Sequence, residues 1–325
     1  MFALLKPALD SVGKRVMRTV VLTPLFFVSD DRKIAIERRL RGREQAAKLG
    51  RADVVIVSFG KSGRTWLRVM LSRFFQVKHA LSERWLIGFD NLHLKNRAIP
   101  KIFFTHDNYL KDFTGNHSDK RDYYDRRVVL LVRHPADVAV SQYHQWRYRM
   151  RPHKKTINDY PEHGKDVSIF SFVAEHEAGL PKVVGFMNDW AREMDKLRQI
   201  LIVRYEDMRA NPAQEVERIT RFMGTPGTEA EIQEAVRYAS FDNMKKLEEK
   251  RHFWLAGGRM QAKDKTNPAS FKVRRGKVGG WRDYFTEEEA AKIDAIVDQT
   301  MLPGFGYTSA EDGKPAWRSG EVVPA

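Results

Sequence analysis

The chain has 325 residues, of which 42% are hydrophobic, so it can bury one substantial core, and its length suits one large α/β domain. Its 57 Lys and Arg residues against 42 Asp and Glu residues give a formal net charge of +15, which should attract anionic ligands, nucleic acid or acidic membrane surfaces. It contains no cysteine, which excludes disulfides, thiolate metal sites and cysteine nucleophiles and makes a reducing cytoplasm the expected location.

Residues 1–28 mix apolar and basic side chains. The apolar run Thr19–Val28 is far shorter than the roughly 20 residues that a membrane span requires, and no small-residue cleavage pattern follows it. We therefore expect neither a transmembrane span nor a cleaved signal. Two interpretations remain open: a helical arm that packs on the domain, or a segment that makes peripheral contact with a membrane.

The next elements predict an α/β fold. Asp30–Leu49 is rich in Arg, Lys, Glu and Ala, which predicts a solvated helix and a helical N-terminal segment over residues 1–50. Four short apolar runs follow, separated by stretches long enough for crossover helices: Val54–Val57, Ile102–Phe104, Val128–Val132 and Ile200–Val203. They predict one P-loop-like, three-layer domain over residues 51–308, with a central, mostly parallel sheet flanked by helices.

Helical patterns and a long polar stretch make up the second half. Helices are predicted near Arg64 and at Ser168–Ala178, Pro181–Arg198, Pro212–Met223 and Glu229–Ala239. Glu248–Gly280 is polar and contains several Gly residues and a Pro, which predicts a long loop with a functional role. Residues 309–325 are expected to form a flexible tail.

The turn after the first predicted strand has the composition of an anion-binding loop. A strand, a glycine-rich turn, a lysine and a helix together direct backbone N–H groups at an anion, so Ser58–Thr65 is expected to hold phosphate or sulfate. Lys61 follows Gly60 and precedes Gly63, whereas a Walker A loop places its lysine after the second glycine. A loop that hydrolyses ATP or GTP is therefore disfavoured.

The same turn resembles the 5′-phosphosulfate loop of the cytosolic sulfotransferase family, Pro-Lys-Ser-Gly-Thr-Thr-Trp. The resemblance implies binding of the donor 3′-phosphoadenosine 5′-phosphosulfate (PAPS) by six residues: Lys61, Ser62, Gly63, Arg64, Thr65 and Trp66. Gly60 replaces the family's proline, and Arg64 replaces its first threonine. A guanidinium can supply the 5′-phosphate contact that the missing hydroxyl would have made.

A second stretch, Arg133–Ser141, resembles the family's 3′-phosphate motif, Arg-Asn-Pro-x-Asp-x-x-x-Ser. Arg133 at a strand end offers a bidentate donor, and Ser141 lies about two turns into the following helix, on which its hydroxyl can reach the same phosphate. The alternative is an ordinary Arg-Asp pair at the start of a helix.

Three further segments resemble the nucleotide-binding parts of the family. Tyr205 would contact adenine, and Phe241 would stack on it within a motif that also contains Ser240 and Met244. Both aromatic residues can equally belong to the core. Arg274–Trp281 resembles Arg-Lys-Gly-x-x-Gly-Asp-Trp, which implies that Arg274, Arg275 and Gly276 contact the 3′-phosphate; the alternative is a solvated basic loop.

Phe104-Thr105-His106 follows the second predicted strand and resembles the family's Lys-Thr-His. The resemblance implies that His106 is the general base, a role worth about 10²–10⁴-fold in rate. It also implies that Lys61 stabilises the bridging oxygen of the leaving group and that Ser141 helps to switch this lysine between contacts. We expect no metal, since the sequence shows no His-x-x-x-His or carboxylate cluster.

The sequence therefore predicts a PAPS-dependent sulfotransferase that acts by in-line displacement on a hydroxyl or an amine. A nucleotide or small-molecule kinase, and a non-catalytic basic protein that binds nucleic acid or membrane, are the alternatives, but neither explains the motifs; no specific nucleic acid is expected. The acceptor can be a small molecule, a sugar or a lipid, and His79–Leu94 and Tyr143–His163 are expected to line its cleft. Oligomeric state stays open because Arg282–Glu287 lacks the Thr-Val pairing of the family's dimer motif.

Overall fold

The computed structural model describes the chain outside residues 1–12, 14–19, 21–26, 254–265, 268–269 and 312–325. The predictions for residues 1–28 and for the C-terminal tail therefore lie almost entirely outside the described residues, and so does part of the predicted loop Glu248–Gly280. In the part of the chain that is described, no helix has both the length and the apolar character needed to cross a bilayer.

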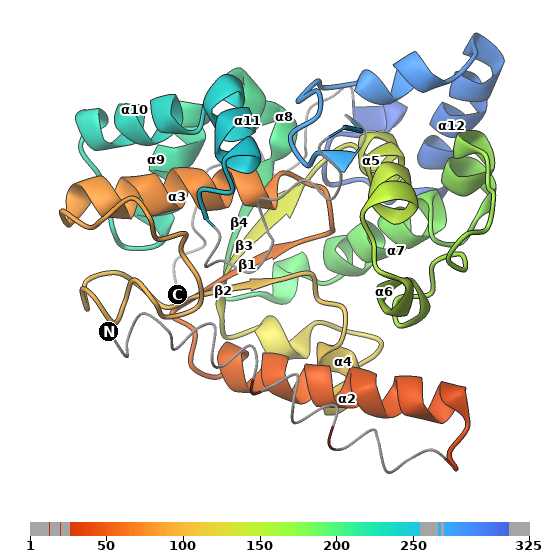
Figure 1. Ribbon diagram of the computed structural model, residues 1–325, viewed down its shortest axis with the longest axis horizontal. Coiled ribbons are helices and arrows are strands. Elements are labelled where there is room, and N and C mark those ends of the chain that lie inside the picture. The colour runs from red at the N-terminus through yellow and green to blue at the C-terminus, as the bar shows by residue number, and fades with distance from the viewer. Residues whose placement is uncertain (1–12, 14–19, 21–26, 254–265, 268–269, 312–325) are drawn as a thin grey trace.

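The core of the fold is a four-stranded parallel sheet in the order β2-β1-β3-β4 (Figure 1). Its strands are β1 (Val54–Ser58), β2 (Ile102–Thr105), β3 (Arg127–Val132) and β4 (Gln199–Arg204). All four apolar runs predicted as strands pair in register, for example Val57 with Thr105 and Leu131 with Val203. The predicted fold class is confirmed.

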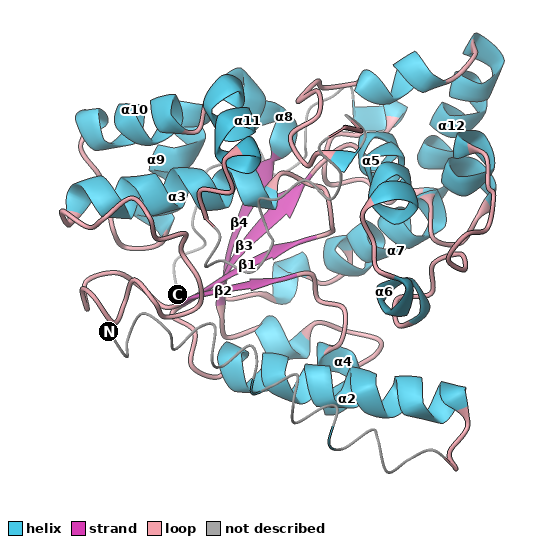
Figure 2. Cartoon of the chain, viewed as in Figure 1, coloured by secondary structure: helices cyan, strands magenta, loops and turns pink. Residues whose placement is uncertain are grey.

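Helices cover both faces of this sheet (Figure 2). Because side chains alternate along a strand, Val54 and Ile56 face one apolar core and Val55 and Val57 face the other. The first core is covered by α3 (Arg64–Lys78), α9 (Pro212–Phe222), α10 (Glu229–Tyr238) and α11 (Phe241–Glu249). The second is covered by α5 (Pro135–Tyr148), α7 (Leu180–Ala191) and α12 (Glu287–Thr300).

Shorter helices complete the molecule, and α2 extends along one side. Helix α2 spans Asp30–Leu49, the bounds predicted for it, and packs against α4 (Leu110–Thr114). Two more short helices are α6 (Pro152–Thr156) and α8 (Tyr205–Ala210).

Two predicted helices differ from the structure. Within Ser168–Ala178 the chain forms a π-helical turn at Ser171–Glu175, then folds back so tightly that a Cβ on Gly179 would lie 2.0 Å from the carbonyl oxygen of Phe172. Pro181–Arg198 is α-helical only as far as Ala191. A 3-10 turn follows at Met194–Lys196, and the chain then enters β4, with the Arg198 N–H donating to the Tyr124 carbonyl at 2.8 Å.

Candidate active site

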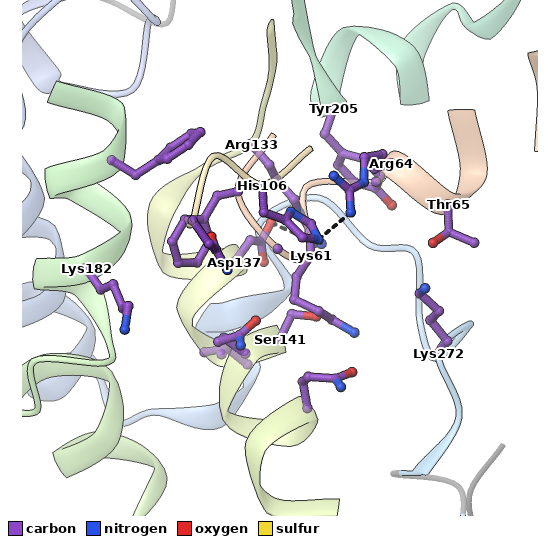
Figure 3. A pocket seen from close by; sticks show the side chains of 18 of the residues that line it. Lys61, Arg64, Thr65, His106, Arg133, Asp137, Ser141, Lys182, Tyr205 and Lys272 are labelled. Carbon is purple, nitrogen blue, oxygen red and sulfur yellow. Dashed lines mark hydrogen bonds and ion pairs between the residues drawn. The ribbon is translucent and has the colours of Figure 1, made fainter. Parts of the chain in front are cut away.

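A cavity of about 720 Å³ opens where the four parallel strands end (Figure 3). Each strand is followed by a residue that lines it: Phe59 after β1, His106 after β2, Arg133 after β3 and Tyr205 after β4. Ligand sites of open α/β sheets lie in this position, outside the carboxyl ends of the strands. We call the part lined by the β1–α3 turn, Arg133, Tyr205 and residues 272–281 the donor end.

The β1–α3 turn follows a path that only particular residues adopt. Lys61 and Gly63 both have positive φ, 76° and 92°, and a Cβ on Gly63 would approach the Tyr205 ring to 2.6 Å. The turn is thus locked against α8 and presents backbone N–H groups to the cavity. Gly63, Arg64, Thr65 and Trp66 line the cavity, whereas Ser62 is buried and does not.

Lys61 lies in a strongly cationic environment. Burial, together with the charges of Arg149, Arg274 and Arg133, lowers the pKa of Lys61 to about 7. An anion bound here would reverse that effect, because it would favour the protonated amine.

Arg133 connects three segments that are far apart in sequence. Its guanidinium donates to the carbonyl oxygens of Lys61 at 3.3 Å and Lys277 at 3.1 Å, and it lies over the Tyr205 ring. It also pairs with Asp137 at 3.3 Å, so the Arg-Asp pair considered above is present as well. Its Nε is buried without a hydrogen-bond partner among the described residues.

The late basic loop is fixed by buried carboxylates. Asp137 accepts hydrogen bonds from the backbone N–H groups of Gly279 and Trp281 at 2.9 and 3.0 Å. Arg274 and Arg275 both line the cavity: Arg274 donates to Tyr284 at 3.1 Å, and the more exposed Arg275 pairs with Asp283.

Aromatic side chains form the wall opposite this loop. Trp66 and Tyr205 meet edge to face at 6.0 Å, and the Trp66 indole donates to the Ala239 carbonyl at 2.8 Å. Phe241 is 36% exposed, and Gly276 lies against its ring. Met244 also lines the cavity; Ser240 is exposed, precedes α11 and does not.

His106 is held in one tautomer by two contacts (Figure 3). Its Nδ1 lies 2.7 Å from the Ser58 carbonyl oxygen, to which it donates, so Nε2 carries the lone pair. That lone pair accepts from the Arg64 guanidinium at 2.5 Å. Burial and the Arg64 charge hold the pKa of His106 well below its usual range, so the imidazole is neutral at pH 7.

Lys272 and Glu248 belong to the site although no sequence motif indicated them. Lys272 lines the cavity, and burial together with the Lys61 charge holds its pKa well below the usual range. Glu248 is 1% exposed, accepts from the N–H groups of Lys272 and Val273 at 2.8 and 2.9 Å, and pairs with Arg149 at 3.3 Å. Glu248 lies 24 residues from Lys272 and 99 residues from Arg149 in the sequence, so no local motif indicates these contacts.

Beyond His106 the cavity has a second part, which we call the acceptor end. It is lined by Arg38 of α2, Asp107–Tyr109, Lys111, Asp112, Lys120, Ile157–Tyr160 and residues of α7. Lys182 of α7 lies across the pocket from Thr65 and Lys272 (Figure 3). Residues of Tyr143–His163 contribute as predicted. The prediction for His79–Leu94 is wrong: none of these residues lines the cavity, and Leu86, Ile87 and Leu92 are buried in the core that α3 covers.

Among the described residues, no three His, Asp or Glu side chains are grouped so that they could bind a metal ion.

The site and the sheet together have the arrangement of a known family. Residues 51–303 match the model of the sulfotransferase domain. The chain belongs to the sulfotransferase family. Cytosolic sulfotransferase 17 of Arabidopsis thaliana is 27% identical over 308 residues, 84% of this chain and 81% of that protein. Flavonol 3-sulfotransferase of Flaveria bidentis is 25% identical over 286 residues, 81% of this chain and 86% of that protein.

A solved structure supports the fold of this sulfotransferase. A mouse sulfotransferase complexed with PAP superposes with a TM-score of 0.53 at 19% identity, over 83% of this chain and 91% of that one. Helix α2 lies outside the residues that match the family model, although it supplies Arg38 to the cavity.

Proposed function

We propose that this sulfotransferase takes the sulfuryl group of PAPS and places it on a hydroxyl of a small acceptor. One observation carries the proposal: a neutral His106 lies between a cationic donor end and a second, separate end of the same cavity. Neither the net charge of the chain nor its fold would by itself require a cavity with two ends and a neutral histidine between them.

The donor end fits an adenosine that is phosphorylated at both of its ends. The N–H groups of the β1–α3 turn and Lys61 suit the 5′ end, and Arg133, with its unpartnered Nε, suits the 3′-phosphate together with Ser141, Arg274 and Gly276. Trp66, Tyr205 and Phe241 offer ring faces to adenine between them. A bound dianion would offset the charge that depresses the pKa of Lys61.

Transfer then requires a proton acceptor and a stabilised leaving group. PAPS supplies a sulfuryl group attached to a phosphate. The acceptor oxygen bonds to sulfur, the bond from sulfur to the bridging oxygen breaks, and its electron pair remains on the 5′-phosphate. The acceptor proton passes to Nε2 of His106, and Lys61 and Lys272 neutralise the charge on the leaving phosphate.

Arg64 has a part in this sequence of events. Its guanidinium occupies the lone pair of Nε2, which must become free before His106 can take a proton. The 5′-phosphosulfate offers Arg64 an anionic partner in place of the imidazole. Donor binding would thereby release the base, and the family motif has a threonine in place of Arg64.

Ligand-induced stabilisation followed by labelled transfer tests the proposal. We expect 3′,5′-adenosine bisphosphate (PAP) to raise the melting temperature, since a ligand at 100 times its Kd stabilises the native state by about 2.7 kcal/mol. Radiolabelled sulfate should then pass from PAPS to an acceptor. Stabilisation by ATP with Mg²⁺ and none by PAP would instead establish the kinase alternative.

A further inference from the structure

The acceptor end carries balanced charge, unlike the donor end. The residues that line it include as many cations as carboxylates: Arg38, Lys111, Lys120 and Lys182 against Asp107, Asp112, Asp159 and Asp189. Their fields cancel at a distance, so this part of the cavity does not attract an acceptor for its net charge. Pockets for flat apolar ligands are lined mainly by apolar and aromatic side chains, and this one is not.

Two of these ion pairs are held in defined geometry. Asp107 pairs with Lys120 at 2.9 Å, and their side chains are 6% and 12% exposed; the Tyr123 hydroxyl donates to the same carboxylate at 2.7 Å. Arg38 binds both carboxylate oxygens of Asp159, at 2.6 and 2.7 Å. A charged acceptor that broke the Asp107–Lys120 pair would leave one of its members buried alone, which is costly.

Neutral polar groups connect the pairs. Asn158 Oδ1 accepts from the Tyr109 hydroxyl at 2.7 Å and from Asn108 at 3.2 Å, and the Asn158 carbonyl accepts from Lys182. A hydroxyl group suits such a wall because it both donates and accepts, so it can bond to either member of a pair without changing its charge.

Gln142 adds an independent observation that points to a ligand. Its amide nitrogen donates to the Tyr160 hydroxyl at 2.7 Å, and the side chain lines the cavity while being 5% exposed. Its Oε1 is buried and has no hydrogen-bond partner among the described residues. A buried oxygen of this kind requires a donor, and a hydroxyl of a bound acceptor provides one.

Aromatic faces complete the lining. Phe59 and Phe186 meet edge to face at 5.5 Å, and Lys182 lies over the Tyr160 ring at 4.8 Å. We propose that the acceptor is an uncharged, hydroxyl-rich molecule of the glycoside class. Its C–H faces pack on these rings while its hydroxyls bond to Gln142, Asn158 and the ion pairs.

Helix α2 takes part in this selection. Arg38 reaches from α2 to the Ile157 carbonyl at 3.0 Å as well as to Asp159, which fixes the Ile157–Tyr160 turn at the mouth of the acceptor end. Because α2 lies outside residues 51–303, acceptor choice depends here on a segment beyond the matched family domain.

An acceptor competition tests the inference, which rests on the proposed function. The full chain with saturating PAPS is given phenyl glycosides, 2-naphthol and benzylamine in separate assays. A site built to bond hydroxyls rejects analogues that lack them by large factors, so we expect kcat/KM for the best glycoside to exceed that for 2-naphthol by about 10²-fold or more. Preference for the phenol or the amine, or no sulfation of any glycoside by protein that binds PAP, overturns the inference. Failure of PAP to bind overturns the proposed function itself.

Two variants then test the residues named. Arg38→Ala should raise KM for the glycoside about tenfold or more, the effect of losing a charged hydrogen bond, with PAP affinity unchanged. Arg39→Ala is the matched control, since Arg39 is exposed on the same helix and does not line the cavity. Lys182→Met, on α7, should likewise raise KM for the glycoside and leave PAP affinity unchanged. Glycoside KM values unchanged in both cavity variants contradict the inference, and an unaltered melting temperature shows that each variant is folded.

Discussion

The two ends of the cavity differ in their charge balance. The donor end, counted together with Arg209 of α8, is lined by eight cations and one carboxylate, Asp137, whereas the acceptor end has four of each. Uncompensated charge at the donor end lowers the pKa values of Lys61 and Lys272, and an anionic ligand relieves it. The acceptor end balances its charges in number and pairs several of them, so it distinguishes ligands by shape and hydrogen bonds. His106 lies between them, so the comparison can be tested from either side.

The largest expected effect separates chemistry from donor binding. His106→Gln removes the proton acceptor without changing the charge of the neutral site, so kcat should fall by about 10²–10⁴-fold. The Kd of PAP, measured by calorimetry, should change far less than kcat, because the imidazole contacts the donor end only through Arg64. A variant that loses PAP binding in proportion to activity would show that His106 is part of the donor end.

Arg133→Ala should have the opposite effect to His106→Gln: it should weaken donor binding more than it slows the chemical step. It removes a guanidinium that serves only the donor end, and the loss of charged hydrogen bonds should weaken PAP binding by about 10–100-fold. With PAPS raised to saturation, much of the rate should return, which does not happen for His106→Gln. An unchanged Kd would contradict the role proposed for Arg133.

The two ends also differ in how far the sequence predicted them. Lys61, Arg133 and His106 each follow a recognisable apolar strand, so a parallel sheet alone places them at one edge. The contacts Arg38–Asp159 and Arg149–Glu248 join segments that share no local pattern, and the pairing depends on how loops pack over the sheet. His79–Leu94 was assigned to the acceptor cleft for its composition, but Leu86 and Ile87 are apolar enough to be buried in the core instead.

The affinity of the donor end for PAP should depend on pH, whereas binding at the acceptor end should not. With its pKa lowered to about 7, Lys61 is charged below that pH and increasingly neutral above it. A bound anion favours the charged form, so PAP affinity should fall as pH rises from 7 to 9, by at most tenfold per pH unit for one proton. The phosphates of PAP are already ionised in this range, with a second pKa near 6.

Calorimetry in buffers of different ionisation enthalpy measures the proton taken up on binding at pH 8. In Lys61→Arg the cation is permanent, so the share of the proton uptake and of the decline in affinity that comes from Lys61 should disappear, and only the share of Lys272 should remain. Equal pH profiles for the two proteins would mean that Lys61 is not the group that titrates. Acceptor KM should not follow this profile, because the acceptor end contains paired charges.

The smallest effect concerns the support beneath the donor end. His134 stacks on Trp281 at 5.9 Å, and burial lowers the pKa of His134 to about 4. An unfolded chain binds a proton near pH 6.5, so the stability from neutral His134 is present above that pH and is lost as pH falls towards 4, at up to about 1.4 kcal/mol per pH unit. His134→Asn should reduce by one proton the slope of the unfolding free energy, measured with urea between pH 6.5 and 5. His163→Asn, an exposed site, is the matched control. An identical slope in His134→Asn and the parent protein would show that the donor end does not depend on this neutral imidazole.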